Sequence, residues 1–130
     1  MCSSDLFQAA RHVEREAVKW YRLAAEQGDA EAQKELVDCY KQQGDCYFLG
    51  AGIREDKQEA VKWYRLAADQ GDAEAQRRLG YFYFWGEGIR EDKQEAVKWY
   101  RLAADQGDAE AQWRLGNCYF WGGDRNKKVR

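Results

Sequence analysis

An internal repeat is the feature that most limits what this chain can fold into. The segment GIREDKQEAVKWYRLAADQGDAEAQ at residues 52–76 recurs unchanged at residues 88–112, a period of 36 residues. A third copy, EAVKWYRLAAEQGDAEAQ, occupies residues 16–33. Trp20 lies 43 residues before Trp63, so the first unit carries seven additional residues. A fixed period of roughly 20–50 residues is typical of a solenoid, in which each unit packs on its neighbours.

Two helices are predicted in each unit. Asp56 lies three residues before Glu59, which is a capping-box start, and Gly71 lies where a left-handed residue would end a helix. These signals predict a first helix, called helix A, over residues 57–70 and a second, called helix B, over residues 72–84.

Apolar residues cover more than half the circumference of helix A when it is drawn at about 100° per residue. Such a helix must be buried on two sides, and stacking of units achieves this. Gly80 on helix B would allow a close approach of the neighbouring backbone. We therefore predict an all-α fold, a right-handed superhelix (solenoid) of antiparallel helix pairs with about three 36-residue repeats.

The predicted organisation is a single repeat domain, residues 1–130. It consists of a first repeat with an extended first helix, starting near Asp5, and the seven-residue insertion (1–51), a second repeat (52–87), a third repeat (88–123) and a C-terminal tail (124–130).

The insertion resembles a duplicated piece of helix B, because LVDCY, QGDCYF and LGNCYF are alike. If the helix continues through it, Cys39 and Cys46 lie on one face with Cα atoms about 10 Å apart, beyond disulfide reach. If Gly44 instead ends the helix and a loop follows, the two cysteines could pair. We favour the longer helix and expect reduced thiols, because the four cysteines are irregularly spaced and offer no structural zinc site.

Composition excludes several function classes. Basic and acidic residues nearly cancel, 21 against 23, which argues against a nucleic-acid partner. No apolar stretch is long enough to span a bilayer, and the first residues lack the apolar core of a signal peptide. We expect no membrane partner and a cytoplasmic location, or a periplasmic or secreted one if an export signal has been removed.

Side chains for catalysis are scarce. His12 is the only histidine, Ser3 and Ser4 are the only serines, and threonine is absent. An activated nucleophile needs a base and an orienting partner within hydrogen-bond reach, and this sequence offers no such set. We therefore predict that the protein is not an enzyme and uses no cofactor and no metal.

The pattern G-x-G-I-x-x-D-x-x-x-A-x-x-W-Y-x-x-A-A-x-x-G-x-x-x-A-x-x-x-L-G-x-x-Y resembles the Sel-one-like repeat, a relative of the tetratricopeptide repeat. The resemblance implies a bacterial adaptor that binds other proteins. A cysteine-rich branch of the family is linked to β-lactam hydrolysis and carries a disulfide between helices A and B. Its positions correspond here to Ala68 with Ala75 and Ala104 with Ala111, so the bridge is missing.

The predicted binding surface is the polar strip of helix A, which stacking would align across the units. We predict that it binds a protein or peptide and that its arginines make better contacts than its tryptophans, which we expect mostly to stack between units. The candidate residues are Lys19, Arg22, Lys62, Arg65, Asp69, Lys98, Arg101, Asp105 and, on the last helix B, Trp113.

Differences between units mark tolerated positions. Arg77 aligns with Trp113 and Lys34, Tyr81 with Asn117, and Phe82 with Cys118. Arg77 and Tyr81 are predicted to lie on the outer side of helix B.

The last helix B has no following helix A in the sequence, so its aromatic residues are expected to be exposed. This end either forms a homo-oligomer or belongs to a longer array. Two alternative functions remain: a β-lactamase-like hydrolase, and a designed or recently duplicated array without its own partner.

Overall fold

A computed structural model describes residues 15–50 and 55–123 of the chain. Its elements follow the repeat. A first helix at residues 15–26 is followed by α2 (Ala30–Leu49), α3 (Lys57–Asp69), α4 (Ala73–Trp85), α5 (Lys93–Asp105), α6 (Ala109–Asn117) and a short π-helix, η1 (Cys118–Gly123).

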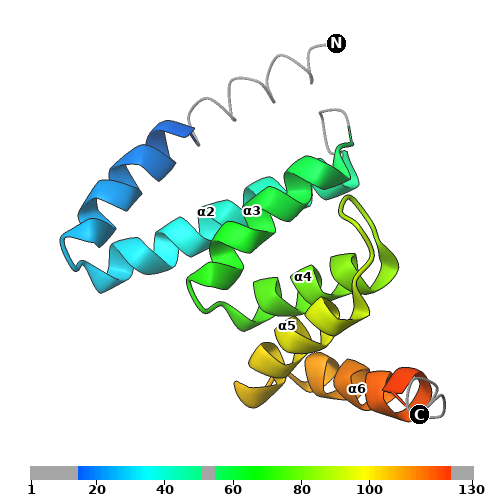
Figure 1. The fold of residues 1–130 in the computed structure, drawn as a ribbon. Helices are drawn as coiled ribbons and strands as arrows, with labels where there is room; N and C mark the ends of the chain where they lie inside the picture. Colours follow the sequence, from blue (N-terminus) through cyan, green and yellow to red (C-terminus); the bar gives the residue numbers. More distant parts are fainter. Residues whose placement is uncertain (1–14, 51–54, 124–130) are drawn as a thin grey trace.

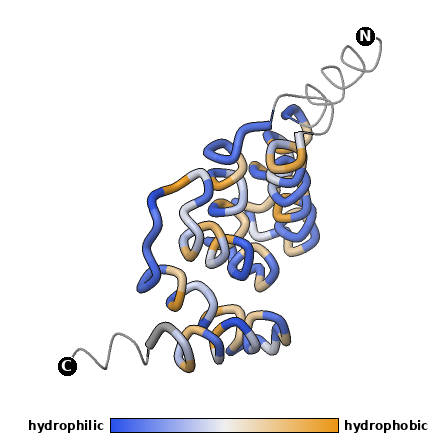
Figure 2. Tube along the Cα trace, turned by 90° about the vertical axis from the view of Figure 1, so that its right-hand side faces the viewer, coloured by the Kyte–Doolittle hydropathy of each residue, from blue (hydrophilic) through white to orange (hydrophobic). Residues whose placement is uncertain are grey.

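The helices stack in sequence order into one elongated array, with the first helix and α6 at opposite ends (Figure 1). This α/α solenoid confirms the predicted fold class. The first helix, α3 and α5 are the A helices, and α2, α4 and α6 are the B helices. Apolar and hydrophilic residues alternate within each helix (Figure 2), and no described helix could cross a membrane.

The helix ends form as the capping signals predict. The Asp56 carboxylate accepts a hydrogen bond from the Glu59 amide at 3.1 Å, and Asp92 caps α5 in the same way. Gly71 has a φ of 95°, which only glycine adopts without strain. These local signals explain why α3 and α4 differ from the predicted helices by at most one residue at either end.

Helix A is buried on two sides, as predicted. Ala60, Tyr64 and Ala67 on α3 are fully buried. The ring of Tyr100 packs onto Gly80, where an added Cβ would lie 2.8 Å from it. α3 and α5 therefore each approach the preceding B helix closely, because a glycine leaves room for their tyrosine.

The seven-residue insertion lies inside α2, which is one uninterrupted helix through Cys39 and Cys46. The longer-helix prediction is confirmed, and the helix holds these cysteines beyond disulfide reach of each other. Seven residues turn an α-helix by about 20° less than two full turns. Both ends of α2 therefore keep the contacts of an ordinary helix B. Tyr40 accepts a hydrogen bond from the arginine of its own unit, as Tyr83 does. Gly44 leaves room for the Tyr64 ring of the next unit, as Gly80 does for Tyr100.

One predicted correspondence is wrong. The structural counterpart of Arg77 is Lys41, because each pairs with the acidic residues that start the next B helix. Lys41 Nζ lies 3.3 Å from the Asp72 carboxylate. The sequence alignment selected Lys34 because it placed the insertion after the start of helix B.

The predicted outward orientation of Arg77 and Tyr81 is also wrong. Arg77 keeps only 20% of its side chain exposed and lies 3.2 Å from Asp108 of the next unit. Tyr81 is half-buried against the core of the array. Both side chains therefore lie where neighbouring units meet.

Several predictions fall outside the described residues. They concern the start of the extended first helix near Asp5, the residues His12, Ser3, Ser4 and Cys2, and the tail at 124–130.

Candidate functional site

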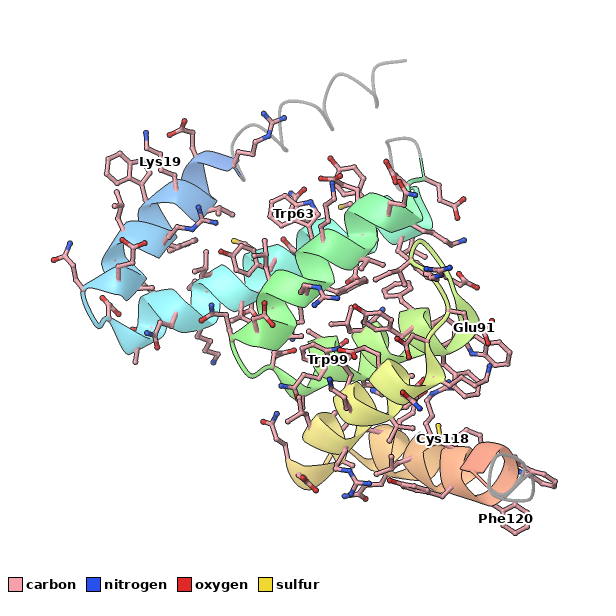
Figure 3. The ribbon with its side chains drawn as sticks, in the orientation of Figure 1. Lys19, Trp63, Glu91, Trp99, Cys118 and Phe120 are labelled. Atoms are coloured by element: carbon pink, nitrogen blue, oxygen red, sulfur yellow. The ribbon has the colours of Figure 1, made fainter. Side chains whose placement is uncertain are left out.

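The predicted strip lies along three successive A helices. Figure 3 shows Lys19 on the first helix, Trp63 on α3 and Trp99 on α5. Its lysines are well exposed, since the Lys62 and Lys98 side chains are 73% and 70% exposed. Each lies near a glutamate one turn earlier, a surface pair that contributes little to stability.

The arginines of the strip each reach a tyrosine of helix B, or of η1 that continues it, in their own unit. Arg22 donates a hydrogen bond to the Tyr40 hydroxyl at 3.0 Å, and Arg65 and Arg101 donate to tyrosines at the same place in their own units. Arg65 also lies over the ring of Trp99 in the next unit, 5.9 Å from its centre. Each arginine therefore joins helices A and B of its unit, and Arg65 also joins adjacent units and is half-buried, whereas Arg22 and Arg101 remain exposed.

The tryptophans of helix A pack between units, as predicted. Trp63 lies 5.9 Å from the ring of Tyr40 in the preceding unit. The indole nitrogens of Trp63 and Trp99 are buried without a hydrogen-bond partner. Trp20, at the same position of the first helix, is 60% exposed.

A groove of about 500 Å³ runs along α3 and brings several predicted residues together. Its second wall comes from the loop between α4 and α5, where Gly88 passes so close to the Lys57 carbonyl that a Cβ would lie 2.4 Å from it. The lining combines the apolar side chains of Val61, Leu66 and Ile89 with Gln58, Lys62, Arg65 and Asp69.

The other predicted residues lie outside this groove. Lys98, Arg101 and Asp105 repeat the strip on α5, where the loop equivalent to Gly88 would come from residues beyond 123, outside the described part. Trp113 lies on α6 and is 63% exposed.

Sequence reasoning missed the leucine that adjoins the arginine on every A helix. Leu23, Leu66 and Leu102 are 43%, 38% and 48% exposed. The signal was present, because the leucine recurs in all three copies, but a helical wheel assigned it to the core.

A second pocket, of about 270 Å³, lies between α4, α5 and α6. The preceding unit has a pocket of about 260 Å³ at the equivalent place. Phe82 lines it and packs on Phe48 and Tyr64 with ring centres 5.5 Å away in each case. Cys118 replaces that phenylalanine, and burial raises the pKa of its thiol. Both units therefore carry a pocket at this place, and in the later of the two a thiol replaces the phenyl ring.

The Sel1 repeat profile matches residues 8–29, 44–72, 73–108 and 109–128, most of the chain. The chain belongs to the Sel1 repeat family. No curated protein sequence matches it. Sel1 repeat proteins generally mediate protein–protein interaction, and they are typically scaffolds rather than enzymes.

Solved structures agree with this assignment. A Sel1 repeat protein from Oxalobacter formigenes is 36% identical with a TM-score of 0.66, covering 83% of this chain and 44% of that protein. The antigen c5321 of uropathogenic Escherichia coli, described as having an SLR fold, is 33% identical with a TM-score of 0.65, covering 81% of this chain and 29% of its own. This Sel1 chain thus spans less than half of either protein.

A third structure, cysteine-rich protein B of Helicobacter pylori, shares the fold at 21% identity, with a TM-score of 0.58 and coverage of 78% of this chain and 94% of that one. The positions at which the cysteine-rich branch is expected to carry its bridge hold buried alanines in this Sel1 protein. Ala68, Ala75 and Ala111 are at most 2% exposed, and Ala104 is 9% exposed. No potential metal-binding cluster occurs among the residues that the structure describes.

Proposed function

We propose that this Sel1 repeat protein is an interaction scaffold that binds a segment of a partner protein in the groove along α3. The observation that carries the proposal is the composition of that groove. Apolar side chains from α3 and the α4–α5 loop line it beside Lys62, Arg65 and Asp69. An apolar pocket with a few charged groups at its edge suits a peptide anchored by one or two side chains.

The charges define the kind of segment. Lys62 is the most exposed cation of the groove, while Arg65 is held by the Tyr83 hydroxyl. A partner carboxylate would therefore meet Lys62 first, and an apolar neighbour would cover Leu66 and Ile89. We expect a segment in which an acidic residue adjoins a large apolar one.

Selection from a displayed random-peptide library tests this proposal without knowledge of the natural partner. The native chain would be used for selection, and its binders would be measured against a chain carrying Lys62→Glu and Leu66→Asp. We expect acidic-apolar peptides whose affinity falls at least about tenfold in the variant, since a contact loss of about 1.4 kcal/mol has that effect.

The chain supplies a matched control. Lys98→Glu with Leu102→Asp makes the same changes in an identical helix sequence on α5, which does not line the α3 groove. Peptides that bind the α5 control with native affinity but bind the α3 variant weakly would support the proposal. Peptides that tolerate both variants, or a library that yields no binder, would contradict it.

A hydrolase of the cysteine-rich branch is the rival function. Sustained hydrolysis of a chromogenic β-lactam by the purified chain would favour it.

A further inference from the structure

The two ends of the described array expose complementary halves of the contact that joins its units. Inside the array, α5 packs on α4 and α3 packs on α2. At one end the first helix has no described B helix before it, and at the other end α6 has no described A helix after it. The first helix repeats the sequence EAVKWYRLAA of α3 and α5 without change.

The uncovered face of α6 is the counterpart of the α4 face that α5 buries. Gly80 is buried under the Tyr100 ring, whereas a Cβ on Gly116 would meet nothing within 4 Å. Gln76 is 5% exposed, while its counterpart Gln112 is exposed. The aromatic residues of η1, which continues α6, are also open to solvent, and Figure 3 shows Phe120 projecting from this end (Tyr119 46%, Phe120 62%).

The first helix shows the matching difference. Tyr64 and Tyr100 are buried at 0% and 1% exposure, whereas Tyr21 at the same position is only half-buried. Trp20 is 60% exposed, although its counterpart Trp63 packs on a tyrosine of the preceding unit. Tyr119, on η1 directly after α6, is the equivalent tyrosine at this end.

We propose that the exposed face of α6 binds the first helix, residues 15–26, of a second copy of this chain, in the register in which α5 binds α4. Tyr21 of the second copy then occupies the space beside Gly116, and Trp20 covers Tyr119. Each copy uses different surfaces at its two ends, so the contact is heterologous and copies add head to tail.

One residue changes the character of this contact. Inside the array, Lys41 and Arg77 pair with the acidic start of the next B helix, and Trp113 takes their place on α6. The acidic residues of the second copy, Asp29 and Glu31, would face this indole without a cation. Contact between copies is therefore weaker and less sensitive to salt than contact within the array.

Sedimentation velocity of the full chain over a wide range of concentrations tests the proposal with two single variants. Gly116→Ala places a methyl group where the incoming tyrosine must lie, and it meets no other atom of its own chain. Trp20→Glu places a charge on the first helix, the other half of the contact. Trp20→Lys replaces it if Trp20→Glu does not fold.

We expect the native chain to form a concentration-dependent series of species and each variant to remain monomeric. The mixture of the two variants is the decisive sample. Trp20→Glu keeps an intact α6 face and Gly116→Ala keeps an intact first helix. Head-to-tail contact therefore predicts a dimer that contains one copy of each variant. We also expect Trp113→Arg to tighten native association about tenfold at low salt and to make it salt-dependent.

Three results would overturn the proposal. The native chain could remain monomeric at its highest soluble concentration, which would leave both faces without this occupant. Gly116→Ala could associate as the native chain does. Association could also persist in Trp20→Glu with no heterodimer in the mixture, which would indicate a symmetric contact between two α6 faces.

Discussion

Helices α4 and α6 begin with nearly the same sequence but lie in different surroundings. Both start with Ala-Glu-Ala-Gln after an aspartate cap and continue through Arg-Leu-Gly. Helix α4 packs between α3 and α5, whereas α6 packs on α5 alone among the described A helices. Leu79 is fully buried on α4, and its counterpart Leu115 is only half-buried. In a solenoid the neighbours of a residue, as much as its sequence, determine what that residue contributes.

The largest expected difference between the two helices concerns their leucines. Leu79→Ala should lower the free energy of unfolding by about 3–4 kcal/mol, because it leaves a cavity in a fully packed site. Leu115→Ala should cost about 1–2 kcal/mol, since part of that side chain already meets water. Urea denaturation of both variants measures the difference. Equal losses would show that α6 is packed as tightly as α4.

The two glycines should give effects of opposite sign. A methyl group on Gly80 would lie 2.8 Å from the Tyr100 ring and 3.2 Å from the Ala96 carbonyl. We expect Gly80→Ala to destabilise the chain by about 1–2 kcal/mol through overpacking, despite the better helix propensity of alanine. Gly116→Ala should stabilise it by up to about 1 kcal/mol, because only the propensity changes. Thermal melts at low protein concentration check both signs, and a stabilising Gly80→Ala would refute the close contact.

Much of this organisation could be predicted from the sequence. The repeat, the aspartate caps and the glycine beside each tyrosine are local or periodic signals, and each recurs in the structure. The place of the insertion was harder to predict. Lys34 and Lys41 are both plausible counterparts of Arg77 until the helix is known to continue for two further turns. The α3 groove depends on Gly88 and Ile89 reaching a helix some 30 residues earlier, which no local pattern encodes.

The arginines show a second limit of sequence reasoning. Position on a helical wheel separates polar from apolar faces, but it does not reveal a partner 18 residues away. Arg65 reaches Tyr83 on helix B, and Arg101 reaches Tyr119 in the same way. A polar strip can therefore be structural along part of its width, as it is at Arg65, where Lys62 is the more available cation.

The pocket beside Cys118 gives the next prediction in order of size. Cys118→Phe restores the residue found at Phe82 and fills space between Phe84 and Tyr100. We expect a gain of about 1 kcal/mol in the free energy of unfolding, because part of a benzyl group becomes buried. The reverse change, Phe82→Cys, is the control and should destabilise the chain more than Cys118→Phe stabilises it. No gain in the first variant would mean that the pocket closes around the thiol.

A smaller effect is expected from the ion pairs between units. Arg77 and Asp108 are 20% and 16% exposed, and their nearest polar atoms are 3.2 Å apart. Replacement of Arg77 by Met keeps much of the side-chain volume and should cost about 0.5–1 kcal/mol at low salt, and less at high salt. Trp113→Met is the matched control, since its position has no such pair to lose. A loss at Arg77 that does not depend on salt would indicate packing rather than charge.

The last prediction has no effect at neutral pH and appears only in alkali. Burial raises the pKa of Tyr100 to about 12 from an ordinary value of 10, although nearby Arg114 opposes the rise. Burial and the hydrogen bond to Asp45 raise the pKa of Tyr64 as well. A hydroxyl that keeps its proton longer in the folded chain contributes stability below pH 10 that is lost as the pH rises toward about 12.

Denaturation midpoints of the native chain should therefore fall over that alkaline range, and Tyr100→Phe should fall less steeply because its ring cannot ionise. Equal slopes in the two proteins would contradict the burial of the Tyr100 hydroxyl. That result would also contradict the close fit of the Tyr100 ring against Gly80, on which the comparison of α4 with α6 depends.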